Sequence, residues 1–426
     1  MNLQGIDNAK ITGARQRLES WFNGMHGPDG YYGPVVGFRG ISMGYCGPGF
    51  DWRYEGLLDG WLLQSQTGSD FVRLERIEGA LAEIWRSQLA NGTLRCSYFE
   101  SNPSEGSMPH EPILMAAALR ARACLCLAGR PVDSGLDTLV ERFVEERLTR
   151  ELWNKALRTF NNWLQSEYEF YSPSAVSAIV EVLIGYEEAT GQTSALEPMI
   201  KGAADSLLAV QIKTGSLAGG VPVSNRSGSP VSPYLAARCQ VAFSLLRRRL
   251  NDERFAQAGD ALESFLRKVA RKEGGFPSLV HQERPASEFP VFVGAAAGVL
   301  TSLARSGRLT DDWLQPHLTL ILGQQTESGA FNTAQGFNGG IRAIPPDWRD
   351  VVPVCGWADK VYHLLSLLQS STFALAPVGA VHRDVTIRGI PAVFEEDDRT
   401  IRLFSGSDNV WFEWEKRTKW PRICNL

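Results

Sequence analysis

The sequence predicts an all-α fold, an (α/α)6 toroid of six outer–inner helix pairs, followed by a small C-terminal antiparallel β unit. Three observations predict this class. A glycine motif recurs at a nearly constant spacing, amphipathic and more apolar helical segments alternate at that spacing, and the end of the chain changes to short alternating runs. We expect the toroid to span residues 1–372 and the β unit, packed on the toroid, to span residues 373–426.

The glycine motif has the form Gln, three residues, Gly, one residue, apolar residue. It occurs at Gln88–Leu94, Gln211–Leu217 and Gln325–Phe331, and degenerate copies begin at His26 and Ala270. The intervals between successive starts are 62, 123, 59 and 55 residues. Since 123 is two repeats of about 61, a sixth copy is expected near residue 150, where the glycine has been lost.

Each motif follows an amphipathic helical segment and precedes a variable loop and a more apolar helix. We expect outer helices at about 7–25, 70–90, 134–150, 194–212, 253–270 and 310–324, and inner helices beginning near 51, 111, 174, 234, 291 and 354. The long connections all run from an outer to an inner helix. They therefore meet at one end of the ring with the inner-helix N-termini, and we expect the functional site there.

The last 54 residues break this pattern. The runs VHRDVTIRG, PAVF, TIRLF and VWFEWE alternate between apolar and polar residues and are separated by the turn-like EEDD and SGSDN. These features predict a small antiparallel sheet. No residue of this unit is assigned a chemical role.

Composition and charge exclude several classes of protein. The net charge is −4, the pI is about 6.0 and no run of Lys or Arg is longer than the three arginines at 247–249, so nucleic acid is not an expected partner. The most apolar windows, 111–128 and 291–304, are rich in small residues and interrupted or flanked by charge, which predicts buried helices and no membrane span. The N-terminus has no apolar signal segment and the seven cysteines form no disulfide pattern, so we expect a cytoplasmic location. No cofactor is predicted, and the oligomeric state is left open.

The repeated motif and the paired helices resemble the α/α-toroid superfamilies. One branch contains terpenoid cyclases and protein prenyltransferase β-subunits. The other contains six-hairpin glycosidases with related polysaccharide lyases and sugar epimerases. The resemblance covers residues 7–371 and implies the architecture rather than one activity.

Two signatures of the first branch are missing. Class II terpenoid cyclases carry an Asp-x-Asp-Asp acid motif on the ring, which is absent here; the acidic run 395–398 lies in the β unit. Protein prenyltransferases bind zinc through Asp, Cys and His. Here Cys355, Asp359 and His363 follow one another at intervals of four on one predicted helix, so the outer two are about 12 Å apart along its axis. This is too far for one ion, and no metal site is predicted.

The starts of the inner helices carry the candidate catalytic residues. Asp51 and Glu55, with an acid at 59, form a stripe on the first inner helix; His110 and Glu111 open the second; Asp359 lies one turn into the sixth. Burial raises the pKa of a carboxyl group, as an acid catalyst near neutral pH requires. The alternative for each residue is a structural role as a helix cap or ion-pair partner.

Aromatic and charged residues in the same region are candidate substrate contacts. Aromatic rings stack on sugars or stabilise a carbocation, and arginines suit an acidic sugar. The candidates are Trp52, Arg53, Tyr54, Tyr171, Tyr234, Arg238, Glu288, Arg342, Trp357 and Lys360.

Three functions are compatible with this arrangement. The leading hypothesis is a carbohydrate-active enzyme, a hydrolase, lyase or epimerase, that uses carboxylate general acid/base chemistry on an oligosaccharide bound at the mouth of the toroid. The mouth arginines would suit an acidic oligosaccharide. The alternatives are a terpenoid cyclase-like enzyme with an aromatic-lined lumen and a non-catalytic binding module. A charged lumen with two carboxylates within about 10 Å favours the first, and an aromatic, nearly uncharged lumen favours the second.

Overall fold

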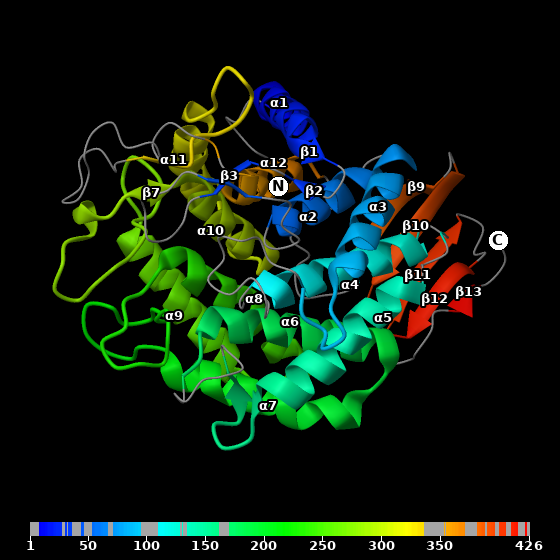
Figure 1. Cartoon of the computed structure of the whole chain (residues 1–426), viewed down its shortest axis with the longest axis horizontal. Helices are drawn as coiled ribbons and strands as arrows, with labels where there is room; N and C mark the ends of the chain where they lie inside the picture. Colours follow the sequence, from blue (N-terminus) through cyan, green and yellow to red (C-terminus); the bar gives the residue numbers. More distant parts are fainter. Residues whose placement is uncertain are drawn as a thin grey trace.

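The structure is a computed structural model that describes residues 8–27, 30–31, 33–35, 44–46, 53–66, 71–94, 110–127, 130, 134–161, 170–335, 353, 355–370, 381–387, 390–396, 400–405, 410–415 and 422–423. In this part of the chain, inner helices form a ring and outer helices surround it (Figure 1). The inner helices are α2 (Arg53–Gln66), α4 (His110–Leu127), α6 (Pro173–Thr190), α8 (Pro233–Leu250), α10 (Val293–Arg305) and α12 (Cys355–Gln369). The outer helices are α1 (Asn8–Met25), α3 (Phe71–Ser87), α5 (Ser134–Arg142), α7 (Thr193–Val210), α9 (Arg254–Val269) and α11 (Asp311–Gly323).

The inner helices close the ring. Each one packs on the next in the order α2, α4, α6, α8, α10 and α12, and α12 packs back on α2. Burial follows the expected difference between the two sets of helices. In the inner helix α6, 13 of 18 residues are buried, whereas the outer helix α9 buries six of 16, on one face. The predicted (α/α)6 toroid is confirmed.

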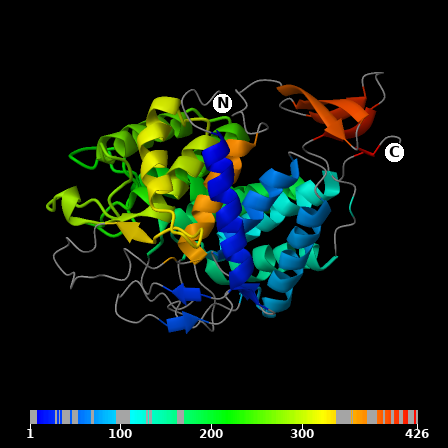
Figure 2. The same ribbon diagram turned by 90° about the horizontal axis from the view of Figure 1, so that it is seen from above.

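Each outer helix packs mainly on the inner helix that precedes it, through a short connection. The pairs are α2 with α3, α4 with α5, α6 with α7, α8 with α9, and α10 with α11. The remaining inner helix, α12, pairs with α1 at the other end of the toroid sequence. Figure 2 shows α1 lying across α12. The sixth pair therefore joins the two ends of the toroid.

The motif glutamines connect neighbouring outer helices. The side-chain amide of Gln88 donates to the Gly92 carbonyl (3.2 Å) and to the Leu139 carbonyl of α5 (2.8 Å). In the last repeat, Gln325 donates in the same way to its own motif glycine, 2.9 Å away, and to the Ala14 carbonyl of α1, 2.8 Å away. The recurring motif is thus a structural joint, and its sixth copy closes the ring.

The motif glycine packs against the next outer helix, and the fourth repeat uses a different glycine from the one the motif predicts. Gln211 bonds to the carbonyls of Gly219 (3.0 Å) and Ala258 (2.8 Å). A Cβ on Gly219, which has φ +85°, would lie 2.1 Å from the Ala261 carbonyl oxygen, whereas Gly215 has no atom within 4 Å of that position. In this repeat the close contact with the next outer helix is therefore made by Gly219, four residues after the motif glycine Gly215.

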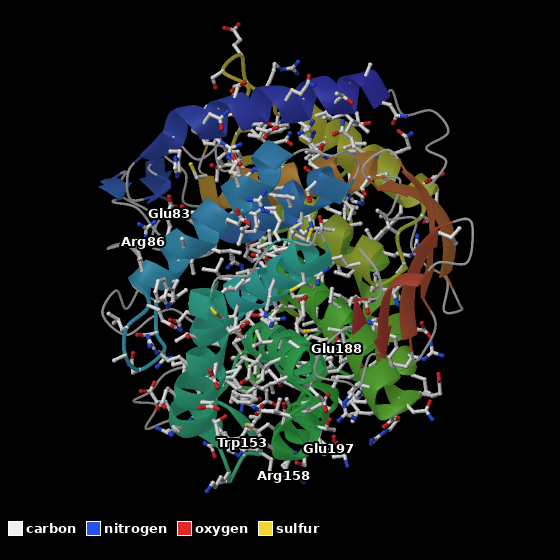
Figure 3. All side chains as sticks on the ribbon, turned by 90° about the vertical axis from the view of Figure 1, so that its right-hand side faces the viewer. Glu83, Arg86, Trp153, Arg158, Glu188 and Glu197 are labelled. Atoms are coloured by element: carbon white, nitrogen blue, oxygen red, sulfur yellow. The ribbon has the colours of Figure 1, made fainter. Side chains whose placement is uncertain are left out.

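The third repeat keeps the turn without a glycine. A hairpin of β5 (Trp153–Asn154) and β6 (Thr159–Phe160) stands where the motif was expected, and Arg158 adopts φ +50° in its turn. Figure 3 shows Trp153 and Arg158 at the bottom of the view, near Glu197, which belongs to α7. Here the glycine is on the facing helix: a Cβ on Gly202 would lie 2.3 Å from the Arg158 carbonyl oxygen.

The third outer helix differs from the single helix expected over 134–150. After α5, the chain continues as a π-helical segment, η1 (Phe143–Leu152), which ends at the β5–β6 hairpin. A π-helix has wider turns than an α-helix and is rare. In η1, Arg147 is buried and pairs with Glu111 of α4.

The C-terminal unit is a five-stranded antiparallel sheet, as the alternating runs predict. Its order is β13 (Arg422–Ile423), β12 (Val410–Glu415), β11 (Thr400–Ser405), β10 (Ile390–Glu396) and β9 (Val381–Ile387). The register places Glu395 opposite both His382 and Arg402. That this sheet packs on the toroid stays a prediction.

Further short strand pairs lie in the long connections. They are β1 (His26–Gly27) with β2 (Gly30–Tyr31), β3 (Gly33–Val35) with β4 (Gly44–Cys46), and β7 (Val291–Phe292) with β8 (Ala334–Gln335). The last of these pairs joins the fifth and sixth long connections at the N-termini of α10 and α12. Among the described helices, none has both the length and the apolarity needed to cross a membrane.

Candidate functional site

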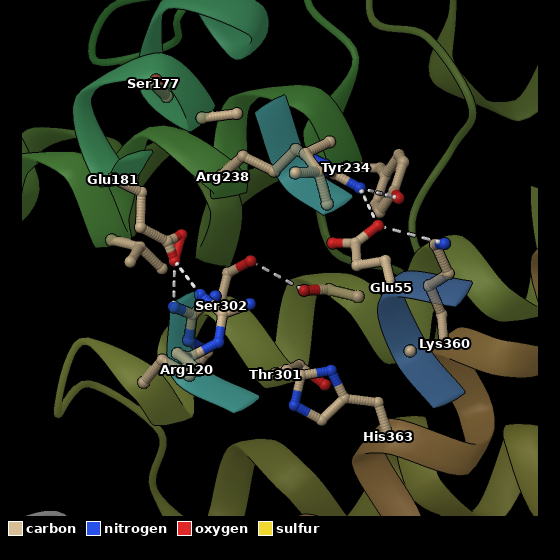
Figure 4. A pocket seen from close by; sticks show the side chains of 16 residues that line it. Glu55, Arg120, Ser177, Glu181, Tyr234, Arg238, Thr301, Ser302, Lys360 and His363 are labelled. Atoms are coloured by element: carbon tan, nitrogen blue, oxygen red, sulfur yellow. Dashed lines mark hydrogen bonds and ion pairs between the residues drawn. The ribbon is translucent and has the colours of Figure 1, made fainter. Parts of the chain in front are cut away.

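A cavity of about 50 Å³ lies inside the ring, and side chains from all six inner helices line it (Figure 4). Charged groups surround it at two levels. Glu55 and Asp59 are four residues apart on α2, as Asp359 and His363 are on α12, so the two levels are about 6 Å apart along the axis. We call the upper level, near the inner-helix N-termini, the mouth layer. The lower level is called the deep layer.

Glu55 is the centre of the mouth layer. Its Oε2 lies 3.1 Å from an Arg238 guanidinium nitrogen and 3.1 Å from Lys360 Nζ. Burial raises the pKa of Glu55, but the two cations outweigh burial and hold it well below its usual range. The side chain is 16% exposed and lines the cavity. Glu55 is therefore an ionised carboxylate with access to the lumen.

Asp359 lies behind Lys360 and is fully buried. Its Oδ2 accepts hydrogen bonds from Lys360 Nζ (2.7 Å) and from the Gly56 amide of α2 (3.0 Å), while Oδ1 is buried and accepts none from the part of the chain that the structure describes. Burial, reinforced by the charge of Glu55, raises the pKa of Asp359 to about 8. Because Lys360 Nζ contacts both carboxylates, their nearest oxygens are less than about 6 Å apart.

The two carboxyl groups are thus shifted in opposite directions. A pair of acids with separated pKa values is the usual arrangement for general acid/base chemistry. The two groups also differ in exposure: the Glu55 side chain is 16% exposed, whereas Asp359 is fully buried. Glu55 has access to the lumen, and Asp359 reaches it only through Lys360.

Aromatic rings extend the mouth layer. The rings of Tyr234 and Trp357 are 5.5 Å apart at 62°, and those of Phe292 and Trp357 are 5.0 Å apart at 30°. The Arg238 guanidinium lies 4.9 Å from the centre of the Tyr234 ring and also bonds to its hydroxyl. All three rings are half-buried, which leaves part of each available to a ligand.

Glycines on the inner helices hold the mouth layer together. A Cβ on Gly56 would lie 2.2 Å from the Asp359 carbonyl oxygen, and a Cβ on Gly294 would lie 2.2 Å from that of Trp357. The backbone of α12 therefore lies directly against α2 on one side and α10 on the other. These contacts fix the position of Lys360 relative to Glu55.

The deep layer is an ion-pair network from five inner helices: Asp59, Arg120, Glu181, Arg305 and His363. Arg120 forms a two-bonded pair with Asp59, both at 2.8 Å, and contacts Glu181 at 2.7 Å. Arg305 also bonds to Glu181, and His363 Nδ1 lies 3.8 Å from Asp59 Oδ2. Burial lowers the pKa of His363 to about 4, so this imidazole is neutral at physiological pH.

The structure brings together part of the candidate set named from the sequence. The residues that meet at the mouth layer are Glu55, Asp359, Tyr234, Arg238, Trp357 and Lys360. Asp51, Trp52 and Arg342 lie outside the described residues. Of Arg53 and His110 the structure describes only the backbone.

Four other candidates lie away from the cavity. Tyr54 is buried and its hydroxyl bonds to Glu83 of α3; the Tyr171 hydroxyl donates to the Ser206 carbonyl of α7 (3.0 Å). The third, Glu288, lies in the short helix η2 (Ala286–Glu288). There it pairs with a neighbouring arginine, four residues earlier, at 3.0 Å.

Glu111, the fourth, faces η1 instead of the lumen. Its Oε1 accepts a hydrogen bond from the Leu94 amide (2.7 Å), and its Oε2 lies 3.5 Å from Arg147 Nε. Burial raises its pKa to about 7 in spite of Arg147. Glu111 therefore joins the second glycine motif to the π-helical segment.

Arg120, Glu181 and Arg305 were not among the candidates named from the sequence, and His363 was considered only as a metal ligand. A signal for them exists in the sequence. Arg120 and Glu181 are charges in the middle of largely apolar inner helices, where an unpaired charge would be very costly. Among the described residues, no three His, Cys, Asp or Glu side chains are grouped as metal ligands.

No protein-family model matches this sequence, and no curated protein matches it either. Solved structures do. A D-mannose isomerase has a TM-score of 0.59 at 12% identity, over 83% of this chain and 96% of that one. The unsaturated glucuronyl hydrolase from Bacillus sp. GL1 has a TM-score of 0.57 at 13% identity, over 85% and 97%.

A sugar epimerase from a ruminal bacterium is similar to the same degree, with a TM-score of 0.57 at 13% identity over 86% of this chain and 100% of that one. Such similarity establishes the fold, an α/α toroid, as the repeated motif predicts. At these identities it does not carry the activity of any of these proteins over to this chain.

Proposed function

We propose that the protein is a carbohydrate-active enzyme, a hydrolase, lyase or epimerase, that acts on an oligosaccharide at the mouth of the toroid. The observation that carries this proposal is Glu55, held ionised between Arg238 and Lys360 beside the half-buried rings of Tyr234 and Trp357. An ionised carboxylate with lumen access can act as a nucleophile, or as a general base once a substrate draws Arg238 and Lys360 away from it, because these cations otherwise weaken it as a base. Aromatic faces beside it suit a sugar ring.

The other candidates take supporting roles in this proposal. Asp359 holds Lys360 against Glu55, and Arg238 and Lys360 would attract a substrate carboxylate, which favours an acidic oligosaccharide. Asp51 and His110 are the proposed proton donors, Trp52 and Arg342 are proposed contacts from the long connections, and Arg53, the first residue of α2, is a further proposed contact. For Glu111, Tyr54, Tyr171 and Glu288, the contacts described above favour structural roles.

The similar proteins support this choice among the predicted functions. Their names include an isomerase, a hydrolase and an epimerase of sugars. The charged lumen speaks against the terpenoid cyclase-like alternative, because a cavity that guides carbocations is expected to be aromatic and nearly uncharged. A binding module without catalysis is the remaining alternative. A cytoplasmic location is part of the proposal, and imaging of the tagged chain would check it.

The test is turnover of neutral and uronate-containing oligosaccharides, followed by NMR, which detects cleavage, elimination and epimerisation alike. Glu55→Gln should reduce kcat by about 10²-fold or more, because the amide cannot accept a proton. The matched control is Glu253→Gln, at a side chain that is 68% exposed and does not line the cavity.

Both variants must keep the circular dichroism spectrum of the wild type. Full activity in Glu55→Gln would exclude Glu55 as the catalytic carboxylate. Binding of sugars by the wild type with no turnover would favour the binding module.

A further inference from the structure

The charged side chains of the deep layer are more exposed than expected for ion pairs that only link helices. The side chains of Arg120, Arg305 and Glu181 remain 30%, 21% and 16% exposed, although they lie on inner helices. His363 is less than one tenth exposed and also lines the cavity. These groups therefore face space inside the ring (Figure 4).

The deep layer has unused hydrogen-bonding capacity of both kinds. Both hydrogen bonds to Glu181 end on Oε1, so within the described part of the chain Oε2 accepts none. His363 makes no hydrogen bond there; its Nδ1 faces Asp59, which leaves Nε2 on the opposite edge of the ring. Arg305 uses one of its nitrogens on Glu181, and a guanidinium has five N–H groups.

This combination selects the chemistry of a ligand. A carboxylate would meet the donors but would be repelled by the free oxygen of Glu181, and a cation would be repelled by the two arginines. A hydroxyl group both donates and accepts, so it satisfies both. The cavity, at about 50 Å³, has room for a few water-sized groups and not for a sugar ring.

We propose that the deep layer is a blind subsite that receives the exocyclic hydroxymethyl group of a single sugar unit. Arg305 donates a hydrogen bond to the hydroxyl of this group, and Glu181 accepts one from it. This inference rests on the proposed function and deepens it. If the ring of the unit lies over the mouth layer, its carbon arm, two bonds of about 1.5 Å each, and one hydrogen bond of about 2.8 Å together span roughly the 6 Å to the deep layer. The enzyme then acts on a free sugar or a chain end, and an acidic group of the substrate lies at the mouth.

The test is the binding of D-glucose, D-mannose and D-galactose by calorimetry, each compared with its 6-deoxy analogue. The wild type should bind the hexoses at least about tenfold more tightly, because the analogue leaves buried polar groups without a partner. D-Glucuronate should bind more weakly than D-glucose. Equal affinity for hexose and 6-deoxyhexose, tighter binding of glucuronate, or binding of no sugar at all would overturn the proposal.

Variants separate this proposal from the proposed function. Arg305→Met should lose the preference for the hydroxymethyl group, and Arg308→Met should keep it, because Arg308 pairs instead with Asp260 and Glu263 of α9. Glu55→Gln should lose turnover and keep the preference. If Glu55→Gln stays active while the preference is present, only the catalytic assignment fails.

A crystal structure of the wild type with D-galactose gives a readout that needs no variant. Density for the hydroxymethyl group between Arg305 and Glu181 is expected. Water alone at that place, with the sugar bound elsewhere, would contradict the subsite.

Discussion

Asp359 shows how a single buried carboxyl group links the stability of the ring to its chemistry. One oxygen contacts Lys360 and the first turn of α2, and the other has no hydrogen-bond partner among the described residues. Leaving a buried polar atom unsatisfied costs about 1–3 kcal/mol. Such a cost is typical of residues kept for function rather than for stability.

The raised pKa of Asp359 gives a defined pH dependence. It is about 8 in the folded chain against the usual 3.8 of an aspartate, so the folded chain holds a proton that the unfolded chain has released. The contribution of Asp359 to stability is therefore full below about pH 4 and is lost as the pH rises through 8. Asp359→Asn should flatten the fall of the unfolding temperature between about pH 5 and 8, measured by calorimetry.

The control for this measurement is Asp260→Asn, at a side chain that is 69% exposed. It should leave the pH profile of the wild type unchanged. An Asp359→Asn profile parallel to that of the wild type would show that Asp359 is ionised throughout this range.

Glutamates at the starts of two inner helices have different roles because they occupy different positions in the first turn, so their side chains point in different directions. Glu55 is the third residue of α2 and lines the cavity, whereas Glu111 is the second of α4 and faces η1. On α4, Ile113 and Arg120 line the cavity, and Glu111 is two residues before Ile113, or about 200° around the helix. The sequence predicted that both acids open buried helices. It could not predict the rotation of each helix, which depends on packing with its neighbours.

At the scale of the elements, the close approach of inner helices depends on glycine. A Cβ on Gly56 would lie 2.2 Å from the Asp359 carbonyl oxygen, a backbone atom that cannot move aside alone. Gly56→Ala should therefore destabilise the protein by about 1–3 kcal/mol or more and displace Lys360 from Glu55. Chemical denaturation, with sugar turnover measured in parallel, checks both effects.

Gly79→Ala is the matched control, since Gly79 lies on the outer helix α3 with no atom within 4 Å of its Cβ position. It should raise the stability by about 0.5–1 kcal/mol, because alanine is the better helix former. If both variants lower the stability equally, close packing of α2 on α12 is not the cause.

The elements themselves were largely predictable, because hydrophobic periodicity and spacing are local properties of the sequence. All six inner helices begin within about two residues of their predicted starts. The exceptions arise from contacts between elements. The π-helical η1 carries Arg147, which pairs with Glu111 of a different helix, and the use of Gly219 in place of Gly215 depends on the position of α9.

At the scale of the whole molecule, the ring is closed by contacts between its first and last helices. Gln325 bonds to Ala14 of α1, and Arg15 of α1 bonds to Gln369 of α12. The sequence predicted a closed toroid from the repeat. The deep layer needed the structure, because its five residues come from five separate helices and meet only after closure.

Gln325→Leu tests the closure. It leaves the Ala14 and Gly329 carbonyls without their donor, at a cost of about 1–3 kcal/mol. Hydrogen exchange should show faster exchange in α1 and in the sixth motif than in α6 and α7, on the far side of the ring. Gln257→Leu, at a residue on the outer helix α9, is the control. Uniformly faster exchange would instead mean that the ring opens as one cooperative unit.

The pairing of α1 with α12 also has a consequence for protein synthesis. The hydrogen bond from Arg15 to Gln369 joins residues 354 positions apart. At about 5–20 residues per second, a ribosome needs roughly 20–70 s to make the segment between them. During that time the apolar face of α1, with Ile11, Leu18 and Phe22, has no partner helix. The nascent chain is thus a candidate client for ribosome-associated chaperones until its last inner helix emerges.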